Sequence, residues 1–559
     1  MITKSEKSKL KIIPLGGLEE VGRNMMLIEY EKDIIIIDAG LQFPEEDMPG
    51  VDYIIPNIAY LKGKENYIRG VIVTHGHFDH IGAIPHIMKR IGNPTIFTAK
   101  LTRAFIEKRQ EEYKDKGKLN IYTVDSSDVL QLGIFKVEFF RVNHTIPDGL
   151  GIAIHTPYGT IVHTGDFKFD PTPIGDEPAD MAKIARLGDQ NVLALCSDST
   201  GADKPGHSIS EKTIKENLKD AFEQTEGRII ISTFSSLITR IQQIFQIAEE
   251  TGRRVAIDGF SMKTNVEIAK RLGYLKIKKG LLVGTKEIKN VPNNKAIILC
   301  TGAQGEERAI LMRIANGEHK DLKIEAGDTI IFSSSVVPGN ERTVQRLKDT
   351  ITRRGAKIFH YQMMDIHAGG HGYQEDLKTM INLAKPKYFI PVHGNRYMLK
   401  MHGDIAQSVG IPEKNIFVSD NGQIMEFDEN KGTLTNRKVP TDHIMVDGLG
   451  VGDVSNIVLR DRKMLAGDGM FVVIVTINGK TGRLVQNPDL ISRGFIYMKE
   501  QKGLVEQARK KVRQIVEGQD PKSLVNYVYI KNKLRDEIGQ FLYKKTERRP
   551  MVLPVVIEV

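Results

Sequence analysis

The chain has 559 residues, of which 40% are hydrophobic and 27% charged. This length suggests about two to four domains, and the composition excludes disordered, collagen-like and coiled-coil classes. The net charge of +9 is only weak support for a polyanionic partner. No apolar run approaches the roughly 18–20 residues that span a bilayer, and residues 1–7 are polar. The two cysteines, Cys196 and Cys300, fit a reducing compartment. We therefore expect a cytoplasmic protein with no membrane partner.

The first two hundred residues read as short apolar strands broken by turns. Helical periodicity is visible at 81–91 and 102–113. This pattern favours two packed sheets with outer helices over a single parallel sheet. The predicted strands are 11–15, 26–30, 34–37, 70–73, 95–98, 135–141, 151–155, 160–163 and 192–195.

From about Ser208 strands and helices alternate, which is typical of a parallel sheet. We interpret this region as an α/β domain inserted into the first one. Its predicted strands are 228–232, 255–257, 296–299 and 329–332, and its predicted helices are 210–225, 238–251, 264–272 and 306–316.

After His367 the pattern predicts helices at 373–383 and 397–408, a strand at 388–391, and strands near Ile416 and Met425. Beyond Gly448 another α/β segment follows, with a strand at 471–477 and helices at 503–516 and 523–541. The predicted segments are 1–208, 209–366, 367–447 and 448–559, of which the first and third form one domain.

The most informative motif is Thr74-His75-Gly76-His77-Phe78-Asp79-His80, directly after a predicted strand. Small Gly76 lets a tight loop point His75 and His77 at one ion, while Asp79 and His80 can turn toward a neighbouring ion. Imidazole and carboxylate ligands suit zinc best, and manganese fits an oxygen-richer site. The alternative is a histidine-rich surface loop.

Further candidate ligands follow other predicted strands. His144 follows 135–141, Asp166 follows 160–163, and His393 follows 388–391. Asp166 is well placed to bridge two metals. Each residue alone is more often an ordinary loop residue, but together with the histidine motif they predict a two-metal site.

These motifs resemble the metallo-β-lactamase superfamily, and Asp38-Ala39-Gly40 matches its first motif. The resemblance implies that His75, His77 and His144 bind one metal and that Asp79, His80 and His393 bind the other. Asp166 would bridge the two metals, and Asp38 would orient a ligand histidine without binding metal. Flavo-diiron members usually carry Glu at the position of His77, so redox chemistry is disfavoured.

The inserted region resembles the β-CASP group of nucleic-acid hydrolases, through Ser197-Asp198-Ser199-Thr200, His367-Ala368-Gly369-Gly370-His371 and Pro391-Val392-His393-Gly394. Within that group the chain is similar to ribonuclease J, at 15–24, 163–170, 333–341, 459–463 and 491–497. The resemblance covers nearly the whole chain. It implies an α/β fold: a metallo-β-lactamase αββα sandwich, an inserted β-CASP α/β domain and a C-terminal α/β domain.

The family resemblance implies a zinc-dependent ribonuclease with 5′-to-3′ exonuclease and endonuclease activity. It would act on single-stranded RNA and leave 5′-phosphate and 3′-hydroxyl products, in messenger decay and ribosomal RNA maturation. The resemblance also implies a homodimer or homotetramer formed through the C-terminal region, or an assembly with a paralogue or ribosome-associated machinery. A paralogue type that has lost part of the histidine motif is weakly active, whereas this chain keeps the motif.

The predicted catalytic residues are His371, Asp198 and the metal ligand Asp79. His371 would protonate the leaving 3′-oxygen and Asp198 would orient it, although Asp198 could instead only cap a loop. RNA phosphates are assigned to His367, His371, Ser334, Ser335 and Ser235. For His367 the alternative is a structural histidine, and for Ser334 and Ser335 it is a turn between a strand and a helix.

Four positions depart from the family pattern. Gly369 stands where Ser is usual, Leu237 and Thr239 where Asn and His are usual, and Phe260 where Arg is frequent. The departures at Leu237, Thr239 and Phe260 motivate a second hypothesis, a weakly active RNA-binding subunit of a degradation complex. A third hypothesis is a β-CASP DNA-repair nuclease, against which the C-terminal match argues.

The positive charge is concentrated near the C-terminus. Residues 499–549 contain 14 Lys and Arg and 7 Asp and Glu, which accounts for +7 of the net +9. The charge therefore does not indicate the active site. It predicts an RNA-facing or assembly surface at the C-terminus, or simply solvated helix faces.

Overall fold

The computed structural model describes residues 8–45, 47–113, 117–306, 308–337, 339–454, 456–479, 481–518 and 527–559. The chain forms two compact units, one of Met1–Phe43 with Ile54–Ile444 and one of Pro44–Tyr53 with Met445–Val559. Residues 1–7, Pro338 of the 333–341 motif, and Asp520, Lys522 and Ser523 of the C-terminal predictions lie outside the described residues.

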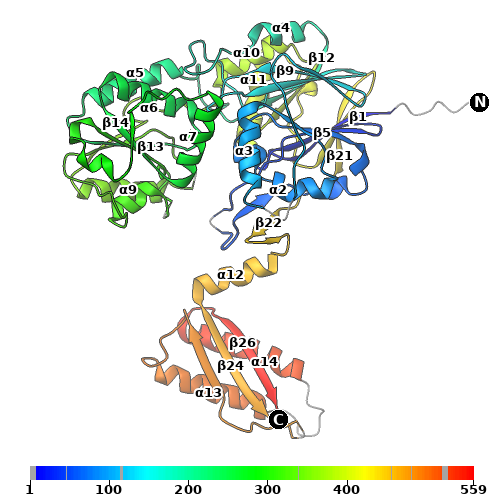
Figure 1. The fold of residues 1–559 in the computed structure, drawn as a ribbon. Helices are drawn as coiled ribbons and strands as arrows, with labels where there is room; N and C mark the ends of the chain where they lie inside the picture. Colours follow the sequence, from blue (N-terminus) through cyan, green and yellow to red (C-terminus); the bar gives the residue numbers. More distant parts are fainter. Residues whose placement is uncertain are drawn as a thin grey trace, which may run out of the picture. The chain divides into compact units, whose positions relative to one another are not determined.

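Two sheets pack face to face in the first unit (Figure 1). One runs β21 (Gly432–Lys438), β20 (Gln423–Phe427), β1 (Leu10–Gly16), β2 (Met25–Tyr30), β3 (Asp33–Ile37), β5 (Ile68–Ile72), β6 (Ile96–Thr98), β7 (Ile121–Thr123). The other runs β19 (Tyr388–Val392), β12 (Val192–Asp198), β11 (Gly159–His163), β10 (Leu150–Thr156), β9 (Phe135–Arg141), β8 (Val129–Leu132).

Apolar side chains from both sheets form the core between them. Ile12, Ile28 and Ile35 from one sheet pack with Phe139 and Ile152 from the other, and all five are fully buried. The outer face of the second sheet is covered in turn by the helices α4 (Met181–Gly188), α10 (Gln374–Ala384) and α11 (Arg396–Ser408). The strands read as near-continuous apolar runs because they are buried on both faces. The predicted pair of sheets with outer helices is confirmed.

The segment with helical periodicity at 81–91 is helical but interrupted. The chain forms α1 (Phe78–Ile81), α2 (Ile84–Ile87) and a 3-10 turn at Met88–Ile91. Gly82 ends α1, and Pro85 lies in the first turn of α2, where its missing N–H is tolerated. The next helix, α3, is continuous over Lys100–Gln110.

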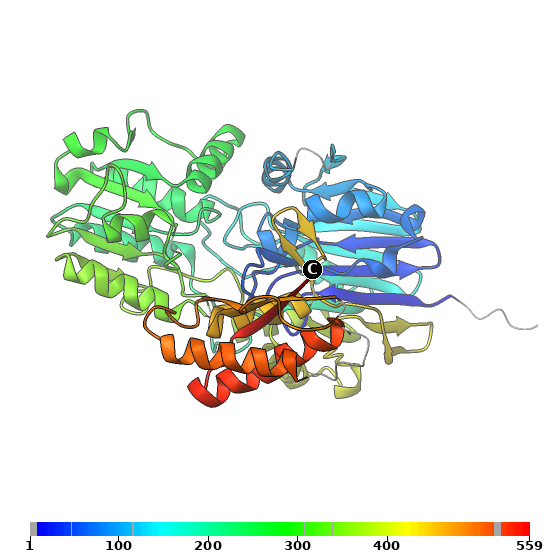
Figure 2. The same cartoon turned by 90° about the horizontal axis from the view of Figure 1, so that it is seen from below.

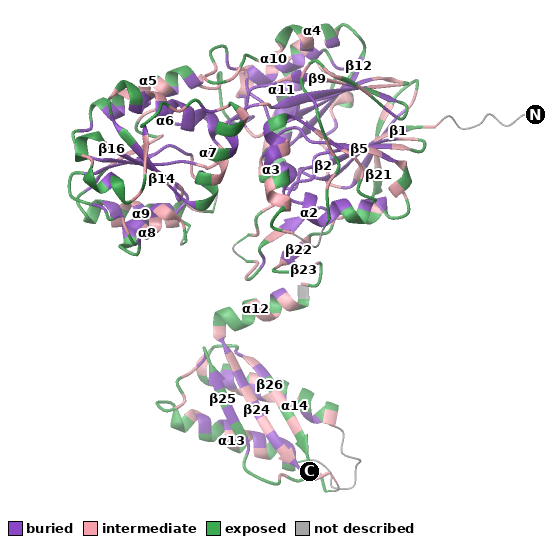
Figure 3. Cartoon of the chain, in the orientation of Figure 1, coloured by how far each residue is buried: buried purple, intermediate pink, exposed green. Residues whose placement is uncertain are grey.

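The inserted domain has a six-stranded parallel sheet covered by helices on both faces (Figures 1 and 3). Its strand order is β15 (Leu282–Val283), β14 (Arg254–Asp258), β16 (Ala296–Cys300), β13 (Ile229–Ser232), β17 (Thr329–Phe332), β18 (Lys357–His360). The helices are α5 (Glu211–Glu223), α6 (Ile238–Glu250), α7 (Phe260–Leu272), α8 (Ile310–Asn316) and α9 (Glu341–Arg353). Helix α9 was missed by the sequence analysis, and α8 begins four residues later than predicted.

A buried ion-pair network ties the inserted domain to the sandwich. Lys168, in the loop after β11, places its Nζ 3.1 Å from Glu211 Oε1 at the start of α5. Arg240 on α6 places Nη2 3.0 Å from Glu211 Oε2, and Gln243 Nε2 donates to the same oxygen at 2.7 Å. Asp170 accepts the Glu211 backbone N–H at 2.8 Å. All these side chains are buried.

In the second unit, β24 (Met470–Ile477) lies between antiparallel β25 (Asp489–Arg493) and parallel β26 (Met551–Glu558). Helices α13 (Lys502–Glu517) and α14 (Tyr527–Thr546) lie together on one side of this sheet, as Figure 2 shows. The remaining α-helix and strands among the described residues are α12 (Asn456–Asp468) and the short strands β4 (Tyr53–Ile55), β22 (Ile444–Asp447) and β23 (Gly450–Val451).

The predicted fold class, a metallo-β-lactamase-type sandwich with an inserted and a C-terminal α/β domain, is confirmed, while the exact segment boundaries stay predictions. Within the described ranges, no helix combines the length and the apolar character needed to cross a membrane. Cys196 and Cys300 are both buried and unpaired.

Candidate active site

The predicted site residues gather at one edge of the sandwich because they follow strands that end there. The motif 74–80 follows β5 of the first sheet. In the second sheet, strands β9, β11, β12 and β19 run in the same direction. Asp198 is the last residue of β12, and the loops after β9, β11 and β19 carry His144, Asp166 and His393. Residues up to 314 positions apart in the sequence thus come into contact.

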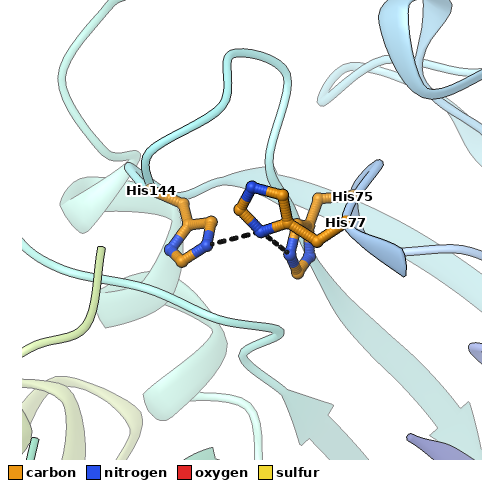
Figure 4. Close-up of side chains that lie close together, drawn as sticks. All are labelled: His75, His77 and His144. Atoms are coloured by element: carbon orange, nitrogen blue, oxygen red, sulfur yellow. Dashed lines mark hydrogen bonds between the residues drawn. The ribbon is translucent and has the colours of Figure 1, made fainter. Parts of the chain in front are cut away.

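Three histidine nitrogens converge on one point. His77 Nδ1 lies 3.0 Å from His75 Nε2 and 3.1 Å from His144 Nε2. Figure 4 shows the three rings turned toward one another, with His75 and His77 from one loop and His144 from another.

The orientation of His144 is set from outside the site. Its Nδ1 lies 2.7 Å from the Gly370 carbonyl oxygen, which can only accept, so Nδ1 carries the proton and Nε2 keeps its lone pair toward the other two rings. Gly370 is required for this contact, because a Cβ there would lie 2.2 Å from His144 Nδ1. The sequence analysis missed this role of Gly370, although it lies within the quoted motif 367–371.

A second group combines two carboxylates and two histidines. His80 Nε2 lies 3.4 Å from Asp79 Oδ2 and 3.2 Å from Asp166 Oδ2. His393 Nε2 lies 3.2 Å from Asp79 Oδ2, and its Nδ1 lies 3.4 Å from Asp166 Oδ1. Asp166 also lies 3.7 Å from His75 and 3.9 Å from His144, so it sits between the two groups.

Asp38 fixes the orientation of His80. Its Oδ2 lies 2.7 Å from His80 Nδ1, and its Oδ1 accepts the Thr74 backbone N–H at 2.8 Å. This places the Nδ1 proton toward Asp38 and leaves Nε2 for the site. Asn24, which the sequence analysis missed, donates from Nδ2 to the Asp79 backbone oxygen at 3.1 Å and so holds the same loop.

Burial and charge divide the histidines into two kinds. Burial lowers the pKa of His77 to about 4 and those of His75 and His144 well below their usual range. Burial also opposes charge on His80 and His393, but Asp166 and its neighbouring carboxylates raise both pKa values, that of His393 to about 10.

The carboxyl groups of the site are ionised. Burial alone would raise the pKa of Asp79 and of Asp166, but the histidines beside them, His80 and His393 foremost, hold both well below the usual range. Among the described residues, Asp38, Asp79, Asp166 and Asp198 form no ion pair with Lys or Arg.

This donor set fits a metal cofactor. In each of the two groups the potential ligand atoms all lie within 4.8 Å of one another. Divalent cations bind neutral imidazole nitrogens and ionised carboxylates, so a cation in the second group would displace the protons that the carboxylates favour on His80 and His393. A third combination, Asp166, Asp198, His371 and His393, satisfies the same distance limit. However, Asp198 is already used by a hydrogen bond to His371.

His371 and Asp198 form a pair beside these groups. His371 Nδ1 lies 2.7 Å from Asp198 Oδ2, and its ring stacks on that of His393 with centroids 5.5 Å apart. Asp198 is buried and His371 is partly exposed. Burial would raise the pKa of Asp198, but His371 holds it well below the usual range. A buried anion therefore supports one ring nitrogen while the ring reaches solvent.

The residues assigned to RNA phosphates lie in different settings. His367 is buried with its pKa lowered to about 3 by burial, and its Nδ1 makes no hydrogen bond with the residues that the structure describes. Ser334 is buried, and its Oγ accepts from Gln304 Nε2 at 3.3 Å. Ser335 and Ser235 are half-buried. These roles stay predictions.

The four departures lie in different settings. Leu237 and Thr239 are buried, and Thr239 Oγ1 donates to the Thr145 carbonyl at 3.4 Å, next to His144. Phe260 begins α7 and is 78% exposed. Nothing lies within 4 Å of a Cβ placed on Gly369, so this glycine leaves open space.

Comparisons with protein families cover most of the chain. "Ribonuclease J, beta-CASP domain" matches residues 226–351, and "Ribonuclease J C-terminal domain" matches 457–559. "Metallo-beta-lactamase superfamily" matches 18–220, and "Zn-dependent metallo-hydrolase RNA specificity domain" matches 359–417.

Individual relatives are similar over their full length. Ribonuclease J2 of Bacillus subtilis is 40% identical over 556 residues, which is 100% of both chains. Ribonuclease J 1 of Streptococcus pyogenes is 40% identical over 550 residues, 98% of both chains. A crystal structure titled as a protein of unknown function from Enterococcus faecalis V583 is 14% identical with a TM-score of 0.56. It covers 75% of this chain and 100% of that one, and this shows a shared fold alone.

Proposed function

Because the chain belongs to the ribonuclease J family of metal-dependent ribonucleases, we propose that it is a zinc enzyme that degrades RNA from the 5′ end and also cuts it internally. The observation that carries this proposal is the complete set of converging ligands with the His371–Asp198 pair beside it. The products would carry a 5′-phosphate and a 3′-hydroxyl.

Two zinc ions are the proposed cofactor, with manganese as the alternative. His75, His77 and His144 would hold one ion, Asp79, His80 and His393 the other, and Asp166 would lie between them. When bound, such cations act as Lewis acids on a phosphodiester and lower the pKa of water. Asp38 and the Gly370 carbonyl hold His80 and His144 in the tautomers that this binding needs.

His371 is the proposed general acid. Cleavage that leaves a 3′-hydroxyl requires a proton on the departing 3′-oxygen, and a partly exposed imidazole can deliver it from Nε2. Asp198 accepts the Nδ1 proton at 2.7 Å and stabilises the charged ring before transfer. Because Asp198 is buried and ionised, it holds the ring in one orientation.

The other assignments follow the same proposal. His367, Ser334, Ser335 and Ser235 would contact RNA phosphates, and the enzyme would act in the cytoplasm in messenger decay and ribosomal RNA maturation. Partners would be single-stranded RNA, a second copy of the chain, and a paralogue or ribosome-associated machinery.

Self-association through the C-terminal sheet is supported by apolar side chains exposed on its strands. These are Leu553, Val555 and Ile557 on β26 and Ile491 on β25, and grouped exposed apolar residues are typical of protein–protein contact sites. Substituting Val555→Lys and Ile557→Lys in the full chain should convert the oligomer to monomer in light scattering. Val528→Lys, at an exposed position of α14, is the control. An unchanged mass would contradict this route of assembly.

The proposed activity is tested by digesting RNA with a 5′-monophosphate or 5′-triphosphate, and DNA of the same sequence, and by measuring metal content. His77→Ala should lose metal and activity. His371→Ala should keep metal and lose about 10²- to 10⁴-fold in kcat, as for other general acids. His155→Ala, whose ring binds Glu138 away from the site, is the control. RNA cleavage that survives both His77→Ala and chelation would contradict the proposal. A preference for DNA over RNA would favour a repair nuclease.

A second candidate, a weakly active RNA-binding subunit, is favoured by Leu237, Thr239 and exposed Phe260. It predicts tight RNA binding and bound metal with negligible turnover in the same assay.

A further inference from the structure

Phe78 lies between two candidate metal ligands but belongs to neither group. It is the first residue of α1, between His77 and Asp79, and its side chain is 49% exposed while His80 and Ile81 in the next turn are buried. Single exposed apolar residues are common on protein surfaces. This one is distinguished by its location, because it starts from the same turn as His77 and Asp79 within the ligand motif.

Backbone hydrogen bonds and a contact with Arg109 hold the Phe78 ring in place. The Phe78 carbonyl accepts the backbone N–H groups of Leu41 at 3.0 Å and Gly82 at 2.7 Å, which fixes the backbone. The guanidinium carbon of Arg109 lies 5.3 Å from the ring centroid, within the range of a cation–π contact. Arg109 is itself anchored by Glu112, 2.6 Å from its Nη1. One side of the ring is therefore packed on a fixed cation, while about half of the side chain stays open.

An open aromatic ring backed by a cation is a surface on which a nucleobase stacks. Every base has a flat π face, so stacking on Phe needs no sequence-specific hydrogen bond. Phe78 is the chain neighbour of both His77 and Asp79, so its ring starts from the same turn as two of the ligands. We infer that Phe78, backed by Arg109, stacks against the RNA base next to the phosphate at the metal ligands. This inference rests on the proposed function in one respect, that RNA phosphate binds at the ligand groups.

The chain has no tryptophan, so Phe78→Trp creates a protein with a single tryptophan as its fluorescent reporter. Single-stranded RNA labelled at its 3′ end is added with a chelator present, and binding is followed by anisotropy in the same sample. We expect RNA to quench the fluorescence of the introduced indole. Tyr122→Trp, at a 54% exposed aromatic position on β7, is the control and should bind RNA without quenching.

An abasic site moved along the RNA tests whether a base causes the quenching. Quenching should disappear for one position of the abasic site and return for the others. In the native sequence, Phe78→Leu, which keeps an apolar side chain without a ring, should weaken binding of intact RNA about 5- to 150-fold, the range expected for one stacked base. The abasic RNA should bind Phe78→Leu and the unsubstituted protein equally, and Phe78→Tyr should restore stacking.

The outcomes separate this inference from the proposed function. If RNA binds and is cleaved when metal is restored, but the fluorescence of the Phe78→Trp protein does not change, the stacking role is overturned and the ribonuclease proposal stands. If RNA binds to neither reporter protein, with or without metal, both are overturned. Quenching that is independent of the abasic position overturns the assignment to a single base.

Discussion

The ion-pair network around Glu211 and the ligand site are both buried clusters of charged side chains in the first unit, and they differ in charge balance. In the ion-pair network, Lys168 and Arg240 face Asp170 and Glu211, so two positive charges meet two negative charges. In the site, the four carboxylates of Asp38, Asp79, Asp166 and Asp198 have only histidines as charged partners among the described residues. The network is complete without a ligand, whereas the site is short of positive charge.

This difference separates a structural cluster from a functional one. Buried ion pairs and catalytic sites both perturb pKa values, so perturbation alone does not distinguish them. The uncompensated charge does distinguish the two clusters, because the site has an excess of negative charge and the network has none. At the site Asp166 raises the pKa values of His80 and His393, which partly restores the balance, and a bound cation would complete it.

The largest effect is expected for Asp166→Asn, which removes the carboxylate between the two ligand groups. RNA cleavage should fall roughly 1,000-fold or more, since a metal Lewis acid supplies several kcal/mol. In the unsubstituted protein, zinc at about 100 times its Kd should add about 2.7 kcal/mol to the unfolding free energy. That increment should be lost in Asp166→Asn and kept in Glu211→Gln. An equal response of both variants to zinc would remove the distinction between the clusters.

Glu211→Gln should act on stability instead. The substitution leaves Lys168 and Arg240 buried with one anion fewer. Because it breaks a buried ion pair, it should lower the unfolding free energy by about 3–5 kcal/mol. The measurement is urea unfolding with metal present. Glu111→Gln, which breaks an exposed pair with Lys108, should cost at most about 1 kcal/mol. A similar loss of unfolding free energy in Glu211→Gln and Glu111→Gln would show that burial of the network does not increase its contribution to stability.

Neighbouring glycines give a matched pair at the site. Gly370→Ala forces a Cβ into the ring of His144 and should reduce metal affinity roughly 10- to 100-fold, as loss of an outer ligand partner does. Gly369→Ala enters open space and should leave affinity unchanged. Isothermal titration with zinc compares the two. Equal affinities would mean that the Gly370–His144 contact does not hold the ligand.

The smallest effect is a pH dependence. Burial would raise the pKa of Glu211, but Arg240 and Lys168 hold it well below its ordinary 4.5, so its contribution to stability is present above that value and falls as the pH drops. The stability gap between the unsubstituted protein and Glu211→Gln should therefore narrow by roughly 1 kcal/mol between about pH 6 and pH 3.5. Urea unfolding at both pH values measures it. A gap that widens in acid would contradict the assignment.

Much of the architecture was readable from the residues alone. Apolar runs with turns predicted the paired sheets, and alternating strands and helices predicted the inserted parallel sheet, because burial imposes these patterns locally. The helical periodicity at 81–91 was readable in the same way, but the breaks in that helical segment lie at Gly82 and Pro85, which apolar spacing alone does not reveal.

Local spacing along the chain was enough to show which side chains are available for metal chemistry, because His75, His77, Asp79 and His80 place four donors on one short loop. How these donors are used depends on the packed fold. Gly369 and Gly370 are identical as residues, yet only one touches His144. Lys168 and Glu211 are 43 positions apart and read as ordinary surface charges until burial pairs them. Tautomers, charge balance and exposure depend on contacts between segments distant in the chain, and local spacing carries no information about those contacts.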